Sequence, residues 1–236
     1  MHQFEVNTLL PIQLGSYDIS FTNSALFMVL SAILITGFLV YSTRGRALVP
    51  GRWQSMAEMS YEMVANLLRD NVGSAGRKYF PFVFSLFMFI LFGNIIGLVP
   101  GSFTFTSHIA VTFAMAIVIF LAVTVIGFAR HGAGFLRLFF PHGAPLWTAV
   151  ILIPIELVSY LSRPISLSVR LFANMVVGHV LLKVIGGFVI MLGIFGVLPL
   201  AVLVGITALE FLVAALQAYV FTILTCIYLH DAIHLH

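Results

Sequence analysis

The chain has 236 residues, of which 61% are hydrophobic and only 8% are charged. A soluble domain carries about 25% charged residues, so this composition excludes an ordinary solvated surface. The formal net charge of +3 is explained by membrane-topology signals without a nucleic-acid partner. The single cysteine excludes a disulfide framework within the chain. We therefore predict an all-α integral membrane protein that forms a single membrane domain over residues 1–236.

Several apolar segments are long enough to cross a bilayer, for which a helix needs about 20 residues. The first is introduced by Thr22, Asn23 and Ser24, whose side chains suit a helix start. We expect membrane spans at residues 21–41, 80–98 and 109–129, and two longer helices at residues 147–190 and 193–229. Together these make about five transmembrane helices.

Residues 52–72 differ from these spans. Apolar side chains such as Trp53, Met56 and Met63 recur there at helical spacing among charged residues. This pattern predicts an amphipathic helix, which is too polar to span and lies at the membrane interface. The Gly- and His-rich residues 130–145 are typical of a surface hairpin.

The segment 147–190 is too long for an upright span. As one helix it measures about 65 Å, whereas the hydrocarbon core is about 30 Å thick. The helix must therefore be strongly tilted or broken. Pro154, Pro164 and the pair Gly186-Gly187 mark the places where it can bend. We expect residues 147–190 and 193–229 to form a long, tilted helical hairpin.

Basic residues indicate the orientation. Six of them fall between the first two spans and none precedes Arg44. The positive-inside rule then places the N-terminus outside and, after five spans, the C-terminus inside. A multi-pass protein of a bacterial plasma membrane fits this arrangement, and so does one of the mitochondrial inner membrane.

Polar residues interrupt the last two helices at helical spacing. Glu156, Arg163 and Arg170 are each seven residues apart, so they share one face, and Asn174 lies close to that face. His179 points to the opposite side. Glu210 and Gln217, also seven apart, share a face of the last helix. An arginine at membrane depth costs at least ~2.5 kcal/mol and generally marks a functional site.

The types of residue suggest proton transfer. Glutamate and histidine exchange protons near neutral pH, whereas arginine remains protonated. Glu156 lies about 21 Å inward of Arg170 by helical rise, and His179 lies about 13 Å outward. This layout predicts two half-channels that are separated by a fixed positive charge. A partner that carries a buried carboxylate past Arg170 would move the proton between them.

Plainer interpretations remain open for several residues. Arg163 could be a snorkelling anchor, and Asn174 and Gln217 could simply hydrogen-bond two helices together. A proton-coupled secondary transporter is the main alternative function, although no internal repeat is visible. We find no phosphate-binding loop and no spacing typical of metal ligands. We therefore expect no catalytic site, cofactor or metal in this chain.

Two stretches carry a family resemblance. The run RPISLSVRLFANMVVGH, with Glu156 fourteen residues before its second arginine, resembles subunit a of the F-type ATP synthase Fo sector. The run LEFLVAALQAYVFTILTCIYL resembles the final helix of that subunit. FTNSALF, FGNIIGLVP and SFTFTSHIAVTF also resemble the family, so the resemblance extends over nearly the whole chain.

The resemblance implies a proton-translocating stator beside a rotating ring of c subunits. Arg170 matches the essential arginine that pairs with each ring carboxylate in turn. The positions that match the outer half-channel are Asn174, His179, Glu210 and Gln217, and Glu156 matches an acidic position of the inner one. The implied partners are the c-subunit ring, the peripheral-stalk b-type subunits, the remaining ATP synthase subunits and the lipid bilayer.

One pair of residues differs from many bacterial members. Many bacterial members of the family have an acid at the position of His179 and a histidine at the position of Glu210, whereas this chain has the two residue types exchanged. The exchange resembles the mitochondrial and closely related bacterial branch, as does the ending IYLHDAIHLH. It predicts a direct contact between His179 and Glu210. His108 stands where some relatives carry an acid, and no role is assigned to it or to Arg163.

Overall fold

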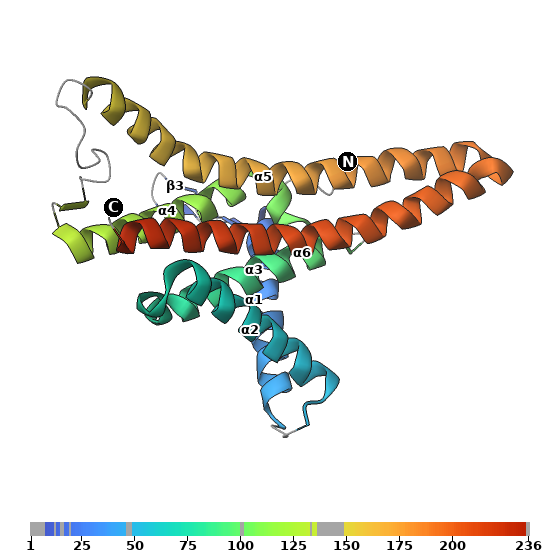
Figure 1. The fold of residues 1–236 in the computed structure, drawn as a ribbon. Helices are drawn as coiled ribbons and strands as arrows, with labels where there is room; N and C mark the ends of the chain where they lie inside the picture. The colour runs from blue at the N-terminus through green and yellow to red at the C-terminus, as the bar shows by residue number, and fades with distance from the viewer. Residues whose placement is uncertain are drawn as a thin grey trace.

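The structure is a computed structural model that describes residues 8–11, 13–14, 17–18, 20–45, 49–99, 102–132, 134–135 and 149–234. Helices dominate these residues (Figure 1). The α-helices are α1 (Asn23–Thr43), α2 (Arg52–Val72), α3 (Phe80–Gly97), α4 (Ile109–His131), α5 (Ala149–Met191) and α6 (Val197–Ile233). Short 3-10 helices are η2 (Ser74–Tyr79), η3 (Phe105–Ser107) and η6 (Gly193–Gly196). The predicted surface hairpin at residues 130–145 falls largely outside the described residues.

Short strands precede α1, and the all-α prediction did not include them. Strand β1 (Thr8–Leu10) pairs antiparallel with β4 (Phe21–Thr22). Strand β2 (Gln13–Leu14) pairs antiparallel with β3 (Tyr17–Asp18). These pairs are only two or three residues long, so the rest of the fold remains helical, as predicted.

Local sequence signals explain where several helices begin and end. The Thr22 hydroxyl accepts a hydrogen bond from the Ala25 amide at 3.4 Å and caps α1, as its side chain predicted. Helix α2 ends at Gly73, whose φ of 76° favours glycine and turns the chain into η2. Pro81 lies in the first turn of α3, where its missing amide proton costs no helical hydrogen bond.

Five helical segments are long and apolar enough to cross a membrane: Asn23–Thr43, Ser74–Gly97, Ile109–His131, Val150–Met191 and Val197–Ile233. Helix α1 crosses the direction of α5 and α6 in Figure 1. With 21 residues, α1 is about 31 Å long and matches the hydrocarbon core in an upright position. With 43 and 37 residues, α5 and α6 are longer than this thickness, and the strong tilt of the α5–α6 hairpin stays a prediction.

Helix α5 is not broken at its prolines. It is continuous over 43 residues and contains Pro154 and Pro164 in its first half, where the ribbon bends (Figure 1). Gly193, with a φ of 54°, begins the turn that leads back into α6. Bending at proline shortens the reach of α5, and the predicted tilt of the hairpin would fit the remaining length into a bilayer.

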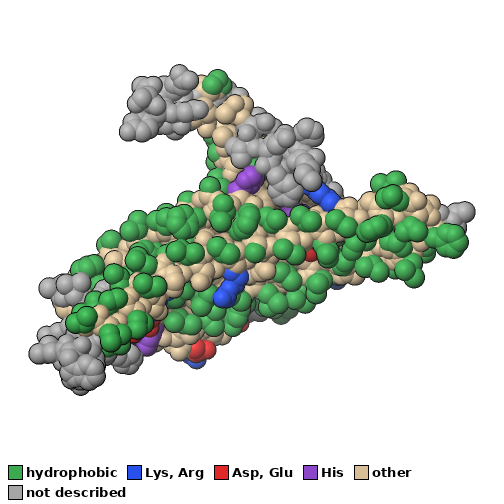
Figure 2. Space-filling view, turned by 90° about the horizontal axis from the view of Figure 1, so that it is seen from above, with side chains coloured by type: hydrophobic (Ala, Val, Ile, Leu, Met, Phe, Trp, Pro, Cys, Tyr) green, Lys and Arg blue, Asp and Glu red, His purple; other side chains and the backbone are tan. Residues whose placement is uncertain are grey.

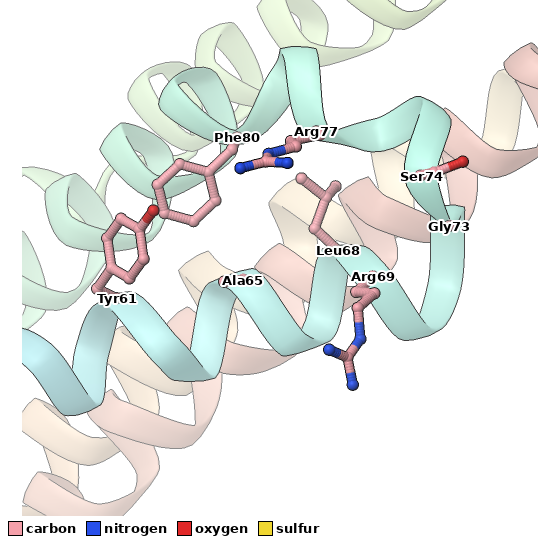
Figure 3. Close-up of a pocket in the computed structure, with 8 residues that line it drawn as sticks. All are labelled: Tyr61, Ala65, Leu68, Arg69, Gly73, Ser74, Arg77 and Phe80. Atoms are coloured by element: carbon pink, nitrogen blue, oxygen red, sulfur yellow. The ribbon is translucent and has the colours of Figure 1, made fainter.

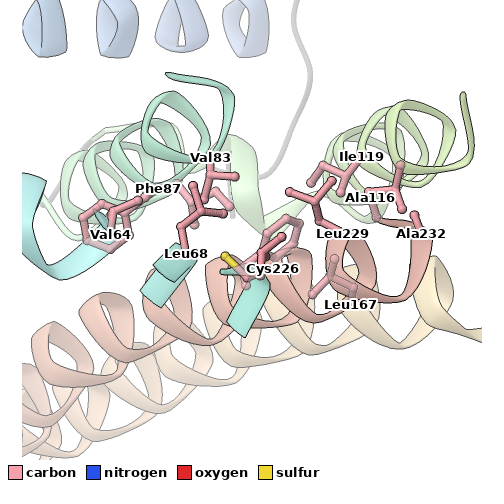
Figure 4. Packing of buried hydrophobic residues seen from close by; sticks show 14 of the residues in the cluster. Val64, Leu68, Val83, Phe87, Ala116, Ile119, Leu167, Cys226, Leu229 and Ala232 are labelled. Atoms are coloured by element: carbon pink, nitrogen blue, oxygen red, sulfur yellow. The ribbon is translucent and has the colours of Figure 1, made fainter. Parts of the chain in front are cut away.

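The core lies where α2, α3 and α4 pack against α6 (Figure 4). Side chains such as Val64, Phe87, Ile119 and Leu229 meet there and are almost fully buried. Cys226 is buried in the same cluster as a free thiol. Outside the core the surface is mainly hydrophobic, with few charged side chains on the face that Figure 2 shows. Such a surface is suited to lipid and identifies a multi-pass membrane protein.

Candidate functional site

A buried carboxylate lies inside the α5–α6 hairpin. The Glu210 side chain is only 8% exposed, and neither of its oxygens has a hydrogen-bond partner among the described residues. It lies against Gly178 of α5, because a Cβ at position 178 would collide with the carboxylate. Glycine at this position is therefore what admits the glutamate between the helices.

Next to Glu210, an amide pair joins the two helices. The Asn174 amide Nδ2 donates to the Gln217 Oε1 at 2.8 Å. Gln217 is 3% exposed, so it shares the inward face of α6 with Glu210, as their spacing of seven predicted. A cavity of about 10 Å³, near the lower limit for one water molecule, is lined by Asn174, Met175 and Glu210. The polar groups of α5 and α6 thus form one cluster.

His179 hydrogen-bonds to the loop before α4 and not to Glu210. Its Nε2 lies 3.0 Å from the hydroxyl oxygen of Thr104. That hydroxyl already donates to the Gly97 carbonyl at 3.0 Å, so its single proton is committed. Thr104 must then accept from a protonated Nε2, which leaves the His179 Nδ1 as an acceptor when the ring is neutral. Glu210 has no hydrogen-bond partner among the described residues, so the contact predicted between His179 and Glu210 is not a hydrogen bond in this structure.

Helix α3 contributes a third helix to this region. The Asn94 amide Nδ2 donates to the Ala214 carbonyl of α6 at 3.2 Å, and Asn94 is fully buried. Ala214 lies one helical turn from Glu210 and almost one turn from Gln217. The contact therefore fixes α3 against the part of α6 that carries the buried polar groups.

An ion pair joins the other end of the hairpin. The Arg163 Nη1 lies 2.9 Å from the Asp231 Oδ2, and both side chains are about one quarter exposed. The Arg163 guanidinium also lies over two aromatic rings, 5.4 Å from the centroid of Tyr160 and 5.0 Å from that of Tyr228. The sequence suggested a snorkelling anchor for Arg163 and no partner, whereas the structure shows a paired arginine that joins α5 to α6.

We expect Asp231→Asn to lower the free energy of unfolding by about 1–2 kcal/mol, because a half-buried guanidinium loses its counter-charge. Unfolding in mixed micelles, followed by circular dichroism, measures this change. The double-mutant cycle with Arg163→Gln isolates the pair. If the two single changes add up to the double change, Arg163 and Asp231 are not energetically coupled.

Arg170, one helical turn before Asn174, and Glu156 form no hydrogen bond with another described residue. Arg170 is exposed on α5 and forms no ion pair with another described residue. Glu156 is half-buried near the beginning of α5. The structure thus brings together Asn174, Glu210 and Gln217, with His179 at the edge of the cluster, and leaves Arg170 on an open face.

His108 precedes α4, outside the spans. Its ring stacks on Phe103, with centroids 4.9 Å apart and planes inclined by 17°. Burial lowers the pKa of His108 below its ordinary value, so the ring is neutral at pH 7. Among the described residues, no three His, Cys, Asp or Glu side chains gather in a way that would hold a metal ion.

Sequence reasoning missed three residues that the structure places at the site, Asn94, Thr104 and Gly178, and also Asp231 at the other end of the hairpin. The first three are short or uncharged and stand in apolar surroundings, where they are common. Asp231 carried a usable signal, because an acid near the C-terminal end of α6 is a natural partner for an arginine in the first half of α5. The others act through partners that are distant in the sequence.

Comparison with known proteins identifies the family. The family model described as the ATP synthase A chain matches residues 25–230. The chain is similar to the ATP synthase subunit a of Paramagnetospirillum magneticum, with 67% identity over 100% of this chain and 98% of the relative. The ATP synthase subunit a of Rhodospirillum rubrum is 63% identical over 100% of this chain and 98% of the relative. That of Mesorhizobium japonicum is 57% identical over 99% of this chain and 96% of the relative. The chain therefore belongs to the ATP synthase A chain family, as its sequence motifs predicted.

Proposed function

We propose that this chain is the proton-translocating stator of an F-type ATP synthase Fo sector. The observation that carries the proposal is the polar cluster around Glu210, which is buried between two helices that are otherwise apolar. Ionisable groups at membrane depth are costly and are retained for ion or proton pathways. The family membership supports the same role.

The outer half-channel uses the cluster on α5 and α6. Glu210 and His179 exchange protons, and the Asn174–Gln217 pair holds the helices at the spacing that they need. Thr104 orients the His179 ring. Glu156, which lies about 21 Å before Arg170 along α5 by helical rise, serves the inner half-channel.

Arg170 separates the two half-channels. Val177, seven residues after Arg170 and on the same face, is an exposed hydrophobic residue, and so is the adjacent Val169. This side of α5 therefore needs a cover inside the membrane. A c-subunit ring that carries one carboxylate per subunit provides both an apolar cover and a counter-charge. Each carboxylate ionises beside Arg170 and is protonated again before it enters lipid.

The orientation follows the basic residues. We place the loop between α1 and α3 on the cytoplasmic side of a bacterial plasma membrane, the N-terminus outside and the C-terminus inside. ATP chemistry takes place on other subunits, since this chain contributes no catalytic site. The b-type subunits of the peripheral stalk hold it against rotation.

The test is ATP-driven acidification of vesicles by the complex assembled with or without this chain. With the chain, ATP hydrolysis should build a gradient that an uncoupler collapses. Without it, hydrolysis should continue and no gradient should form. Proton-coupled solute uptake by the isolated chain in liposomes would contradict the stator role and favour a transporter.

Thr104→Val should slow proton pumping about tenfold, because valine keeps the shape of threonine but removes the hydroxyl that accepts from the His179 Nε2. Initial rates of vesicle acidification at matched amounts of assembled complex measure this. Thr104→Ser keeps the hydroxyl and should pump at nearly the wild-type rate. Equal pumping by the valine and serine variants would show that the hydrogen bond has no part in proton transfer.

A further inference from the structure

A second cavity lies away from the hairpin, between the end of α2 and the start of α3. Its volume is about 410 Å³, within the usual range of ligand pockets. Gly73 turns the chain from α2 into η2, and this brings Arg77 back over the last turns of α2. Figure 3 shows the Arg77 side chain extending between Leu68 and Phe80. The cavity is thus built by a chain reversal at a defined glycine.

The lining combines an aromatic wall with two arginines. The rings of Tyr61 and Phe80 have centroids 4.6 Å apart, and Phe80 stacks on Phe84 at 5.5 Å. Arg69 and Arg77 also line the cavity. An apolar wall beside guanidinium groups fits a ligand that has both an anionic group and a hydrocarbon part.

The two arginines have no counter-charge of their own. Both are exposed, and neither forms an ion pair with another described residue. No acidic side chain is among the residues that line the cavity. In Figure 3 the Arg77 guanidinium extends into the cavity, whereas the Arg69 guanidinium points away from it, so Arg77 supplies the positive charge inside the pocket and Arg69 lies at its rim. A phosphate group would complement the Arg77 guanidinium through paired hydrogen bonds.

The cavity lies at the level of the membrane surface. Helix α2 is amphipathic and exposes Trp53, Met56 and Met59, as a helix at the interface does. Phe80 begins α3 and lies within the candidate span Ser74–Gly97. A headgroup bound at Arg77 would thus have its acyl chains beside Phe80, about one helical turn further into that span.

We propose that this pocket binds a phospholipid with an anionic headgroup. Arg77 holds the phosphate inside the cavity, Arg69 adds positive charge at the rim, and the upper part of an acyl chain packs against Tyr61 and Phe80. Basic pockets at the cytoplasmic ends of membrane helices have this chemistry. The proposal does not depend on proton transfer by the hairpin.

Native mass spectrometry of the full chain, with added phosphatidylglycerol or phosphatidylcholine, tests the proposal. The wild-type chain should bind phosphatidylglycerol at least about tenfold more tightly than phosphatidylcholine. Arg69→Gln with Arg77→Gln should remove about tenfold of that preference. Lys78→Gln with Arg130→Gln removes the same charge outside the pocket and should leave the preference unchanged.

Three results would overturn the assignment. Equal losses in the two double variants would mean that surface charge alone attracts the lipid. Displacement of phosphatidylglycerol by millimolar inorganic phosphate would mean that the pocket binds the anion without the acyl chains. Ready cross-linking of Ser74→Cys to another protein in the assembled complex would mean that a protein subunit covers the pocket.

Discussion

Arg170→Ala should abolish ATP-driven acidification while the complex still assembles. The arginine is the permanent positive charge on the open face of α5, and it forms no ion pair with a described residue of its own chain. Without it, a ring carboxylate has no counter-charge at the point where it must ionise. The fixed charge that repels a hydronium ion between the two routes is also lost. Acidification of vesicles, normalised to the amount of assembled complex, measures the effect.

A passive measurement separates the two functions of Arg170. Vesicles that carry the membrane sector alone should leak protons faster with Arg170→Ala than with wild type, because the electrostatic barrier is removed. Arg130→Ala removes an exposed arginine from the last turn of α4 and should change neither pumping nor leak. Retained pumping by Arg170→Ala would make this arginine structural and would reopen the transporter interpretation.

Glu210→Gln should reduce proton pumping by on the order of a hundredfold, the scale of a lost proton-transfer group. Glutamine fits the same space against Gly178, so the packing of α5 and α6 is preserved while the exchangeable proton is lost. Initial rates of acidification and of ATP synthesis measure the effect. Glu62→Gln makes the same chemical change on the exposed face of α2 and serves as the matched control.

The exchange of Glu210 and His179 extends this test. His179→Glu with Glu210→His should pump faster than either single variant, because Glu210 lies against Gly178 and His179 is the next residue. The two groups then belong to one site even though no hydrogen bond joins them. If the double variant is no better than the single ones, the two side chains act independently.

The helices follow from the sequence because each apolar run has only one stable form in lipid, in which every backbone group is paired within the helix. The inward face of α6 also follows, since Glu210 and Gln217 are seven residues apart. The partners across the hairpin do not follow. Between the Asn174–Gln217 contact and the Arg163–Asp231 contact, the chain runs through more residues of α6 than of α5. Pairing residues at equal distances from the turn of the hairpin therefore gives the wrong partners.

Thr104 and Asn94 illustrate a second reason. Their partners His179 and Ala214 lie 75 and 120 residues further along the chain. No periodicity within one helix reports a contact of that kind. The role of Gly178 cannot be predicted from the sequence either, because a glycine in an apolar helix is common. Only the packing shows that this glycine makes room for Glu210.

The contacts across the hairpin also set an order of events during synthesis. Arg163 is made 68 residues before Asp231, and Asn174 is made 43 residues before Gln217. At 5–20 residues per second, Arg163 waits about 3–14 s for its partner. A charged helix alone in lipid is costly for that time. Helix α5 must therefore stay with the insertion machinery until α6 emerges, and the two helices enter the bilayer as a pair.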